Sequence, residues 1–229
     1  MTSICIGEMI EARFEERVNR FLCRVVMNDQ SVAAHLHDPG RLRELLRTDV
    51  PVVLRPEHGP HRKTAYDLIG VYAGDTLVSI DSRVPNRLVK RALQEKAIPE
   101  IEGYSTVVPE YTYEDSRIDF CLDERIFVEV KGVTLVKNDH AFFPDAPTER
   151  GKKHLRTLMY ALREGFQSYI VFVVQRPDAH RFSPNAVTDP EFAHLFAQAV
   201  RCGVCPLVYT SMFVGNCIHM KEKVSLIEF

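Results

Sequence analysis

The chain has 229 residues, of which 45% are hydrophobic and 26% are charged, and its formal net charge is −2. These values are typical of a globular protein and exclude a chain that is basic throughout or too polar to fold. No apolar run approaches the roughly 18 residues that a membrane-spanning helix needs, and the N-terminus carries no basic leader. We therefore expect a cytoplasmic protein with one large domain or two modest ones and no membrane partner.

Residues 1–82 are predicted to form a small β-rich domain. Strand-like runs lie at 21–27, 31–37, 50–56, 64–73 and 75–81, separated by turn residues. With a brief helix around 41–47, this content favours a five-stranded barrel of the oligonucleotide-binding (OB) type. The alternative is a helical first segment, because residues 11–22 also carry a partial helical period.

Residues 83–229 are predicted to form a second, mixed α/β domain. After a junction at 82–86, a helix is expected over 86–96 with Asn86 as its cap, and strands at 106–113, 116–122 and 125–131. A polar loop over 137–147 leads to a helix that Thr148 caps and Gly165 ends. A buried strand at 169–175, a helix at 190–201 and a strand at 207–213 follow. The three early strands should be antiparallel, whereas the helical link from 131 to 169 allows a parallel crossover.

The six cysteines are expected to be reduced thiols rather than a disulfide framework. Cys202 and Cys205 have metal-ligand spacing, and Cys217 with His219 would complete a zinc set. Buried thiols are the better interpretation of this weak pattern.

Three ionisable residues interrupt the apolar strands of the second domain. Buried charge is costly unless it is paired or coordinates a metal. Side chains alternate along a strand, so Glu129 and Lys131 should share one face, and a hairpin near Asp123 would bring Asp119 beside them. The opposite face of the Asp119 strand would carry Ile118, Phe120 and Leu122.

Two carboxylates with a lysine suit phosphodiester hydrolysis. Asp119 and Glu129 would hold Mg²⁺ or Mn²⁺, which keeps waters and takes one or two carboxylates plus substrate phosphate. Such an ion polarises a phosphoryl group and lowers the pKa of a bound water, and Lys131 would stabilise the developing charge. On the bare pattern alone, a buried acid–lysine pair with an unrelated surface acid is the favoured alternative.

The segment 148–156, TERGKKHLR, adds four cations and a histidine directly after the acidic strands. Its helix N-terminus carries a partial positive charge that favours phosphate. We interpret the segment as a binding site for nucleic-acid phosphates, with a solvated helix face as the alternative.

These segments resemble those of a known family. SRIDF (116–120), EVKGVTL (129–135) and FPDAPTERGKKHL (143–155), with HDPGRL (37–42), are similar to the sugar fermentation stimulation protein (SfsA) family. The resemblance implies an N-terminal OB-like barrel and a C-terminal domain similar to PD-(D/E)XK nucleases, with an αβββαβ core. It also implies non-specific DNA binding and a link to sugar (maltose) utilisation in bacteria.

The resemblance assigns Asp119, Glu129 and Lys131 as the catalytic set, with Asp119 and Glu129 as metal ligands. Where this chain has Arg91, family members tend to carry a glutamate, so Glu95 or Glu100 is a candidate for the extra acid. Two functions stay open: a Mg²⁺- or Mn²⁺-dependent nuclease, and a catalytically silent DNA-binding regulator of sugar metabolism. RNA or a nucleotide as substrate is not excluded. The expected nucleic-acid-binding residues are Arg117, Arg150, Lys152, Lys153, His154 and Arg41.

Overall fold

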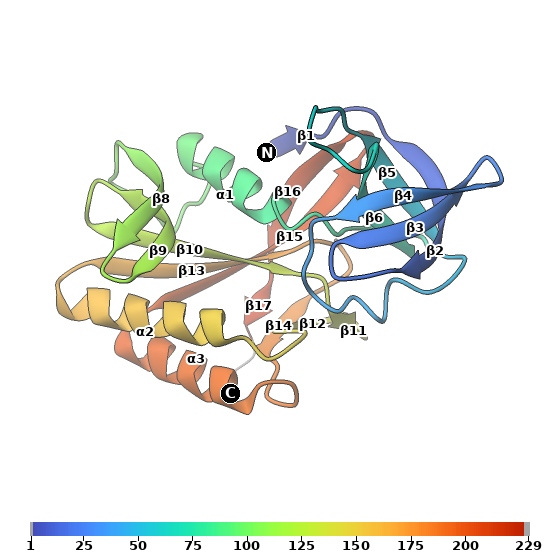
Figure 1. Ribbon diagram of the computed structural model, residues 1–229. Helices are drawn as coiled ribbons and strands as arrows, with labels where there is room; N and C mark the ends of the chain where they lie inside the picture. The colour runs from blue at the N-terminus through green and yellow to red at the C-terminus, as the bar shows by residue number, and fades with distance from the viewer. Residues whose placement is uncertain (1, 227–229) are drawn as a thin grey trace.

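The computed structural model describes residues 2–226, and it shows a β-barrel packed against a mixed sheet covered by helices (Figure 1). Pairing between β4 and β6 closes a five-stranded barrel, and β7 extends its sheet in the order β4-β3-β2-β5-β6-β7. The predicted OB-like barrel is therefore confirmed. Its strands are β2 (Ile10–Arg17), β3 (Leu22–Met27), β4 (Gln30–Leu36), β5 (Pro51–Pro56), β6 (Tyr66–Ala73) and β7 (Thr76–Ser79).

Two details of the barrel differ from the sequence-based expectation. The helical alternative for residues 11–22 is wrong, because β2 occupies residues 10–17, with Ala12 and Phe14 buried between exposed charges. This burial has the two-residue period of a strand. The brief helix expected around 41–47 is a turn over 43–45, in which Leu46 N–H donates to the carbonyl of Leu42.

The second domain is built on a seven-stranded mixed sheet in the order β1-β16-β15-β13-β10-β9-β8, in which β10, β13 and β15 are parallel. The predicted αβββαβ order and the parallel crossover from β10 to β13 are confirmed. The elements are β1 (Ser3–Cys5), α1 (Val84–Gln94), β8 (Val107–Tyr113), β9 (Ser116–Leu122), β10 (Ile126–Val133), α2 (Glu149–Arg163), β13 (Gln167–Val174), α3 (Pro190–Cys202), β15 (Cys205–Val214) and β16 (Cys217–Lys223).

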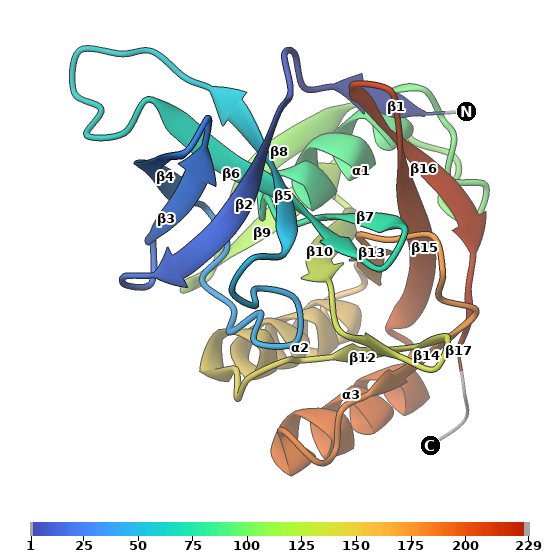
Figure 2. The ribbon, with the colours of Figure 1, turned by 90° about the vertical axis from the view of Figure 1, so that its right-hand side faces the viewer.

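A smaller sheet lies beside the ends of α2 and α3 (Figure 2). It contains β11 (Val136–Lys137), β12 (His140–Phe143), β14 (Arg181–Pro184) and β17 (Ser225–Leu226), in that order. The polar loop predicted over 137–147 is thus partly strand. Its β12 pairs in parallel with β14, a partner about 40 residues away that no local pattern indicates.

Helices cover both faces of the large sheet: α1 packs on one face and α2 with α3 on the other (Figure 2). Strand β10 alternates as expected, with Val128 and Val130 in the α1 cluster and Phe127 in the α2 cluster. The prediction for β9 was partly wrong. Phe120 packs on the α1 face, whereas Ile118 packs on the α2 face, so the alternation changes at Asp119.

The N-terminal strand belongs to the second sheet, although the predicted first domain begins at residue 1. Antiparallel pairing of β1 with β16 places Cys5 opposite Cys217, and the two form a disulfide. The expectation that all six cysteines are reduced thiols is therefore wrong, and Cys217 is not available as a zinc ligand. Within residues 2–226 no group of three or more His, Cys, Asp and Glu residues is arranged to hold a metal ion.

In the same described range, no helix has the length and apolar character needed to cross a membrane. Residue 1 and residues 227–229 of the two predicted domains lie outside the described residues.

A buried carboxylate joins the barrel to the start of α1. Asp67 of β6 is fully buried and accepts hydrogen bonds from His37 Nε2 (2.9 Å), Arg55 (2.9 Å), Arg83 (3.0 Å) and Arg62. Burial alone would raise the pKa of Asp67, but these donors hold it well below its usual range. Because Arg83 directly precedes α1, this ion cluster fixes the helix against the barrel.

Replacing this carboxylate should destabilise the fold. We predict that Asp67→Asn lowers the free energy of unfolding by about 3 kcal/mol, near the low end for removing one partner of a buried ion pair because the arginines are partly exposed. Urea denaturation measures the change. The exposed Asp75 is the matched control, and Asp75→Asn should change stability by less than about 0.5 kcal/mol. Equal effects of the two substitutions would contradict the assignment.

Candidate functional site

Asp119 lies where β9 separates from β10. The last paired residues are Phe120 and Val128, and beyond them the N–H of Val130 donates to Asp119 Oδ2 at 2.8 Å. Asn86 Nδ2 donates to Asp119 Oδ1 at 2.7 Å. The Asp119 carboxylate thus takes the place of a backbone carbonyl as the acceptor for the N–H of Val130 in β10. Both the sheet and α1 orient it.

The role of Asn86 differs from its predicted one. The N-cap of α1 is Arg83, without a side-chain cap bond, and Asn86 lies inside the first turn. Its amide is consequently free to hold Asp119. Pro85 is the sequence signal for this earlier start, because proline is favoured at the first helical positions.

Glu129 is buried on the α2 side of the sheet, where its side chain is 1% exposed. Its Oε1 accepts from Lys131 Nζ and from His154 Nδ1, and Lys131 Nζ lies 3.3 Å from His154 Nδ1. Among the described residues, Glu129 Oε2 has no hydrogen-bond partner although it is buried. Such a group is unusual in folded proteins and suggests an absent ligand or water.

The two carboxyl groups have opposite pKa shifts. Burial raises the pKa of Asp119 to about 6, and the neighbouring Glu129 charge adds to the shift. Burial would also raise the pKa of Glu129, but Lys131 and His154 lower it below the usual value. Glu129 is therefore ionised at neutral pH, whereas Asp119 gains and loses its proton at about pH 6.

This donor set suits one hard divalent cation. Glu129 Oε2 has both lone pairs open, and each Asp119 oxygen receives one N–H and keeps a further lone pair. With two protein carboxylates, Mg²⁺ or Mn²⁺ would retain water and leave positions for a phosphate oxygen.

The predicted phosphate-binding residues of α2 divide into two groups. Arg150 and Lys153 are exposed; Arg150 Nε donates to His154 Nε2 (3.4 Å) and Lys153 pairs with Asp115 (3.0 Å). Lys152 and His154 are buried. Lys152 bridges Glu149 and Glu191, 2.7 Å from each, and joins α2 to α3, whereas His154 supports Glu129.

The position of Lys152 follows from helical spacing. It lies three residues before Leu155 and six before Leu158, so it continues the apolar stripe toward the N-terminus of α2. Arg117, by contrast, is exposed on β9 and pairs with Glu110 at 2.8 Å.

The two candidates for an extra acid have other partners. Glu95 accepts from Arg91 (2.7 Å) and Thr2 (2.8 Å), and Glu100 accepts from Tyr209 (2.6 Å) and Lys223 (2.5 Å). At 1.5 Å per residue, Glu95 lies about 13 Å along α1 from Asn86. Neither contacts Asp119 or Glu129.

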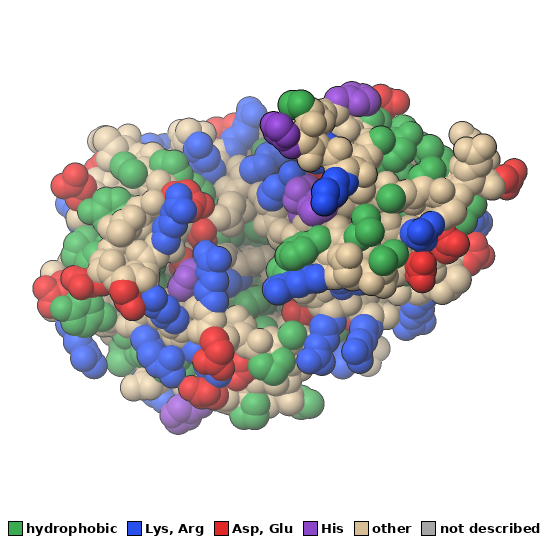
Figure 3. All heavy atoms as spheres, viewed as in Figure 1, with side chains coloured by type: hydrophobic (Ala, Val, Ile, Leu, Met, Phe, Trp, Pro, Cys, Tyr) green, Lys and Arg blue, Asp and Glu red, His purple; other side chains and the backbone are tan. Residues whose placement is uncertain are grey.

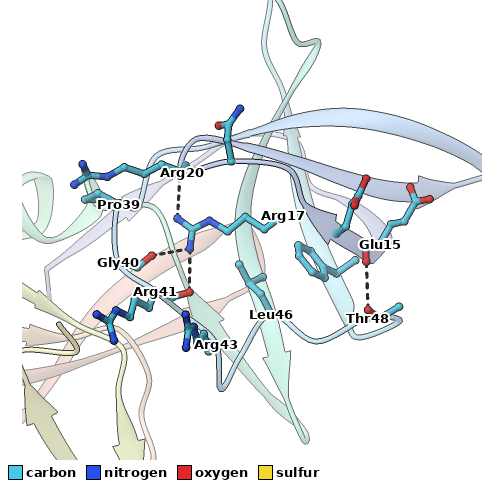
Figure 4. A pocket seen from close by; sticks show the side chains of 12 residues that line it. Glu15, Arg17, Arg20, Pro39, Gly40, Arg41, Arg43, Leu46 and Thr48 are labelled. Carbon is cyan, nitrogen blue, oxygen red and sulfur yellow. Dashed lines mark hydrogen bonds between the residues drawn. The ribbon is translucent and has the colours of Figure 1, made fainter. Parts of the chain in front are cut away.

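Arg41 lies on a barrel loop that approaches α2. Its N–H donates to Asp145 Oδ2 at 2.9 Å. The Arg17 guanidinium holds the loop by donating to the carbonyls of Arg20, Gly40 and Arg41 (Figure 4) and of Asp38. A Cβ at Gly40 would lie 2.7 Å from Asp145 Oδ2 and 2.8 Å from Asp38 Oδ1, so a larger residue would displace these carboxylates. Arg41 and Arg43 line a cavity of about 560 Å³.

The surface between the two domains is hollowed and rich in cations. Figure 3 shows lysine and arginine side chains on both sides of this hollow. A polyanion would be attracted to such a surface although the net charge of the chain is −2.

Comparisons with known proteins match both halves of the chain. The family described as sugar fermentation stimulation protein RE domain matches residues 83–215, and the SfsA N-terminal OB domain matches residues 16–80. A sugar fermentation stimulation protein homolog from Alkaliphilus metalliredigens is 41% identical over 225 residues, covering 96% of this chain and 94% of that protein. One from Clostridium perfringens strain 13 is 40% identical over 221 residues, covering 95% and 94%.

A solved structure is also similar over the whole chain. It is described as the structure of Pyrococcus furiosus SfsA in complex with Ca²⁺, with a TM-score of 0.92, 27% identity and coverage of 100% of both chains.

The Arg41 loop carries a pH-dependent contact. Burial raises the pKa of Asp38 to about 6, and Asp145 contributes. Because an unfolded aspartate titrates near about 3.9, the contribution of Asp38 to stability is full below that pH and is lost as pH rises through about 6. We predict that Asp38→Asn raises the free energy of unfolding near pH 8 by on the order of 1 kcal/mol and leaves it unchanged near pH 4.

Chemical denaturation at both pH values measures this effect. The exposed Asp75→Asn variant is the control and should show the same difference from the wild type at both. A stabilisation by Asp38→Asn that is equal at the two pH values would contradict the argument.

Proposed function

Because the chain belongs to the sugar fermentation stimulation protein (SfsA) family, we propose that it is a cytoplasmic DNA-acting protein with a divalent-cation phosphodiester site at Asp119 and Glu129. The observation that carries the proposal is the buried, unpartnered Oε2 of Glu129 beside Asp119. An Asp followed by Glu-x-Lys on the adjacent strand is also the arrangement that the PD-(D/E)XK likeness implies.

The chain's own residues have separate tasks in this proposal. Asn86 orients Asp119, and His154 with Lys131 keeps Glu129 ionised. The ammonium of Lys131, whose side chain is 12% exposed, stabilises negative charge that develops on the phosphate. Mg²⁺ or Mn²⁺, when bound, would supply polarisation of a phosphoryl oxygen and a bound water of lowered pKa.

The substrate's flanking phosphates would lie along the cationic hollow. Arg150 is exposed in the first turn of α2, where the helix end favours anions. Arg41 lies on the barrel loop whose backbone N–H donates to Asp145, shortly before α2. These contacts do not read base edges, so we expect binding without strong sequence preference.

The Ca²⁺ complex of the related Pyrococcus furiosus protein supports a hard-cation site. Calcium and magnesium both prefer oxygen ligands, although they differ in coordination number.

A second candidate is a catalytically silent DNA-binding regulator of sugar (maltose) metabolism. The observation that favours it is that Glu129 Oε1 already accepts from Lys131 and from His154. Since Glu95 and Glu100 are also bound elsewhere, the pocket has less negative charge for holding a metal.

DNA nicking distinguishes the two candidates. We predict that the purified protein nicks supercoiled plasmid with Mn²⁺ or Mg²⁺ and not with chelator. The rate should fall about 100-fold or more in Lys131→Ala, because a lost electrostatic stabiliser has that effect. Lys221→Ala, a substitution on β16, is the charge-matched control and should retain the rate.

Nicking that persists in chelator or in Lys131→Ala would contradict the proposed site. Salt-dependent DNA retardation without nicking would instead favour the regulator. Failure of the wild type to bind nucleic acid at low salt would exclude both candidate functions, the nuclease and the regulator.

A further inference from the structure

Three rings form a row on the outside of the barrel, next to the start of α1. Phe21 precedes β3, His35 lies in β4 and His37 follows it. The Phe21 and His35 rings are stacked, with centroids 6.2 Å apart and planes inclined by 17°. The His37 ring meets His35 edge to face, with centroids 4.3 Å apart and planes inclined by 76°. We call Phe21, His35 and His37 the aromatic row.

The aromatic row lies on the outside of the barrel, where Phe21 is exposed and His35 and His37 are half-buried. Ala34 and Leu36 are fully buried, so the alternation of β4 directs His35 and His37 away from the core. Phe21 is 45% exposed. Burial, followed by the neighbouring His37, lowers the pKa of His35, so its ring is uncharged at neutral pH.

Cations flank the row at both ends. The Arg20 guanidinium lies over the Phe21 ring, 5.4 Å from its centroid. At the other end, His37 shares the Asp67 carboxylate with Arg62 and Arg83. The Arg62 and Arg83 side chains are 26% and 41% exposed, and the NH1 group of each makes no hydrogen bond to any residue within 2–226.

We propose that the aromatic row binds successive bases of a single-stranded nucleic acid, with phosphates held by Arg20, Arg62 and Arg83. Rings provide stacking surfaces for any base, and cations follow the backbone, which is how single strands are bound without sequence preference. A duplex keeps its base faces inside the stack and cannot use the rings. This inference rests on the proposed function and specifies the substrate class as single-stranded.

The position of the row connects it to the candidate site. Arg83, at one end of the row, is the N-cap of α1, and Asn86, three residues later, holds Asp119. A strand stacked on the barrel would thus continue along the start of α1 toward the two carboxylates.

A tryptophan probe tests the proposal. The chain contains no tryptophan, so Phe21→Trp introduces a single indole into the row. Tyr160→Trp, at a site that is 46% exposed near the end of α2, is the matched control. Fluorescence is titrated at low salt with oligothymidylate, with oligouridylate and with a duplex of equal length. We expect saturable quenching of the indole at position 21 by a single strand, little by the duplex, and none at position 160.

Affinity provides the second readout. Phe21→Leu keeps the apolar character and removes the stacking surface, so it should weaken single-strand binding about tenfold, from the roughly 1–3 kcal/mol that stacking contributes per base. Duplex affinity and thermal stability should stay unchanged. Quenching by oligothymidylate or by oligouridylate supports the proposal and identifies the strand as DNA or RNA.

Three results would overturn the inference. The first is equal quenching of the tryptophans at positions 21 and 160, and the second is quenching at position 21 by the duplex as strong as that by single strands. Either result would show that the aromatic row does not bind single strands, and it would leave the proposed cation site unaffected. Unchanged single-strand affinity in Phe21→Leu leads to the same conclusion. A wild-type protein that binds no nucleic acid at low salt would remove the proposed function together with this inference.

Discussion

The buried carboxylate of Asp67 holds the start of α1 against the barrel, because it binds Arg83 together with cations from the barrel. From that fixed start, Asn86 reaches β9 and orients Asp119, which in turn binds the backbone of β10. The first turn of α1 therefore contacts both the barrel and the candidate cation site, through Arg83 and Asn86 respectively.

The two carboxylates of the candidate site differ in how well their negative charge is stabilised. Lys131 and His154 stabilise ionised Glu129, whereas burial and that same charge oppose ionisation of Asp119. A divalent cation would remove this conflict by favouring the charged form of both groups. The arrangement explains how a sheet interior tolerates two acids and a lysine, because each side chain has a polar partner and Glu129 Oε2 keeps its lone pairs open.

Much of the fold could be predicted from local patterns. Thr148 caps α2 as expected, since its side chain accepts from Gly151 N–H. The helical periodicities and the continuous apolar run of β13 indicated the core elements. The proximity of Asp119 to Glu129 followed from the short hairpin and strand alternation. The region 11–22 is ambiguous because Ala12 and Phe14 fit the two-residue period of a strand, whereas Phe14, Val18 and Phe21 fit a helical period.

The remaining features depend on contacts distant in sequence. The Cys5–Cys217 disulfide requires β1 to pair with β16 across a separation of 212 residues. The burial of Lys152 depends on acids of α3, and the engagement of His154 with Glu129 depends on how α2 lies on the sheet. A charge run in a sequence therefore indicates cations but does not separate those that bind ligands from those that join helices.

In the proposed site, Asp119 and Glu129 would share one divalent cation. Titration calorimetry with Mn²⁺, on the wild type and on Asp119→Asn, tests it directly without any nucleic acid. We expect the wild type to bind one Mn²⁺ ion per chain and the Asp119→Asn variant to lose that binding. Stoichiometric binding that survives the substitution, or a wild type that binds no ion, would contradict it.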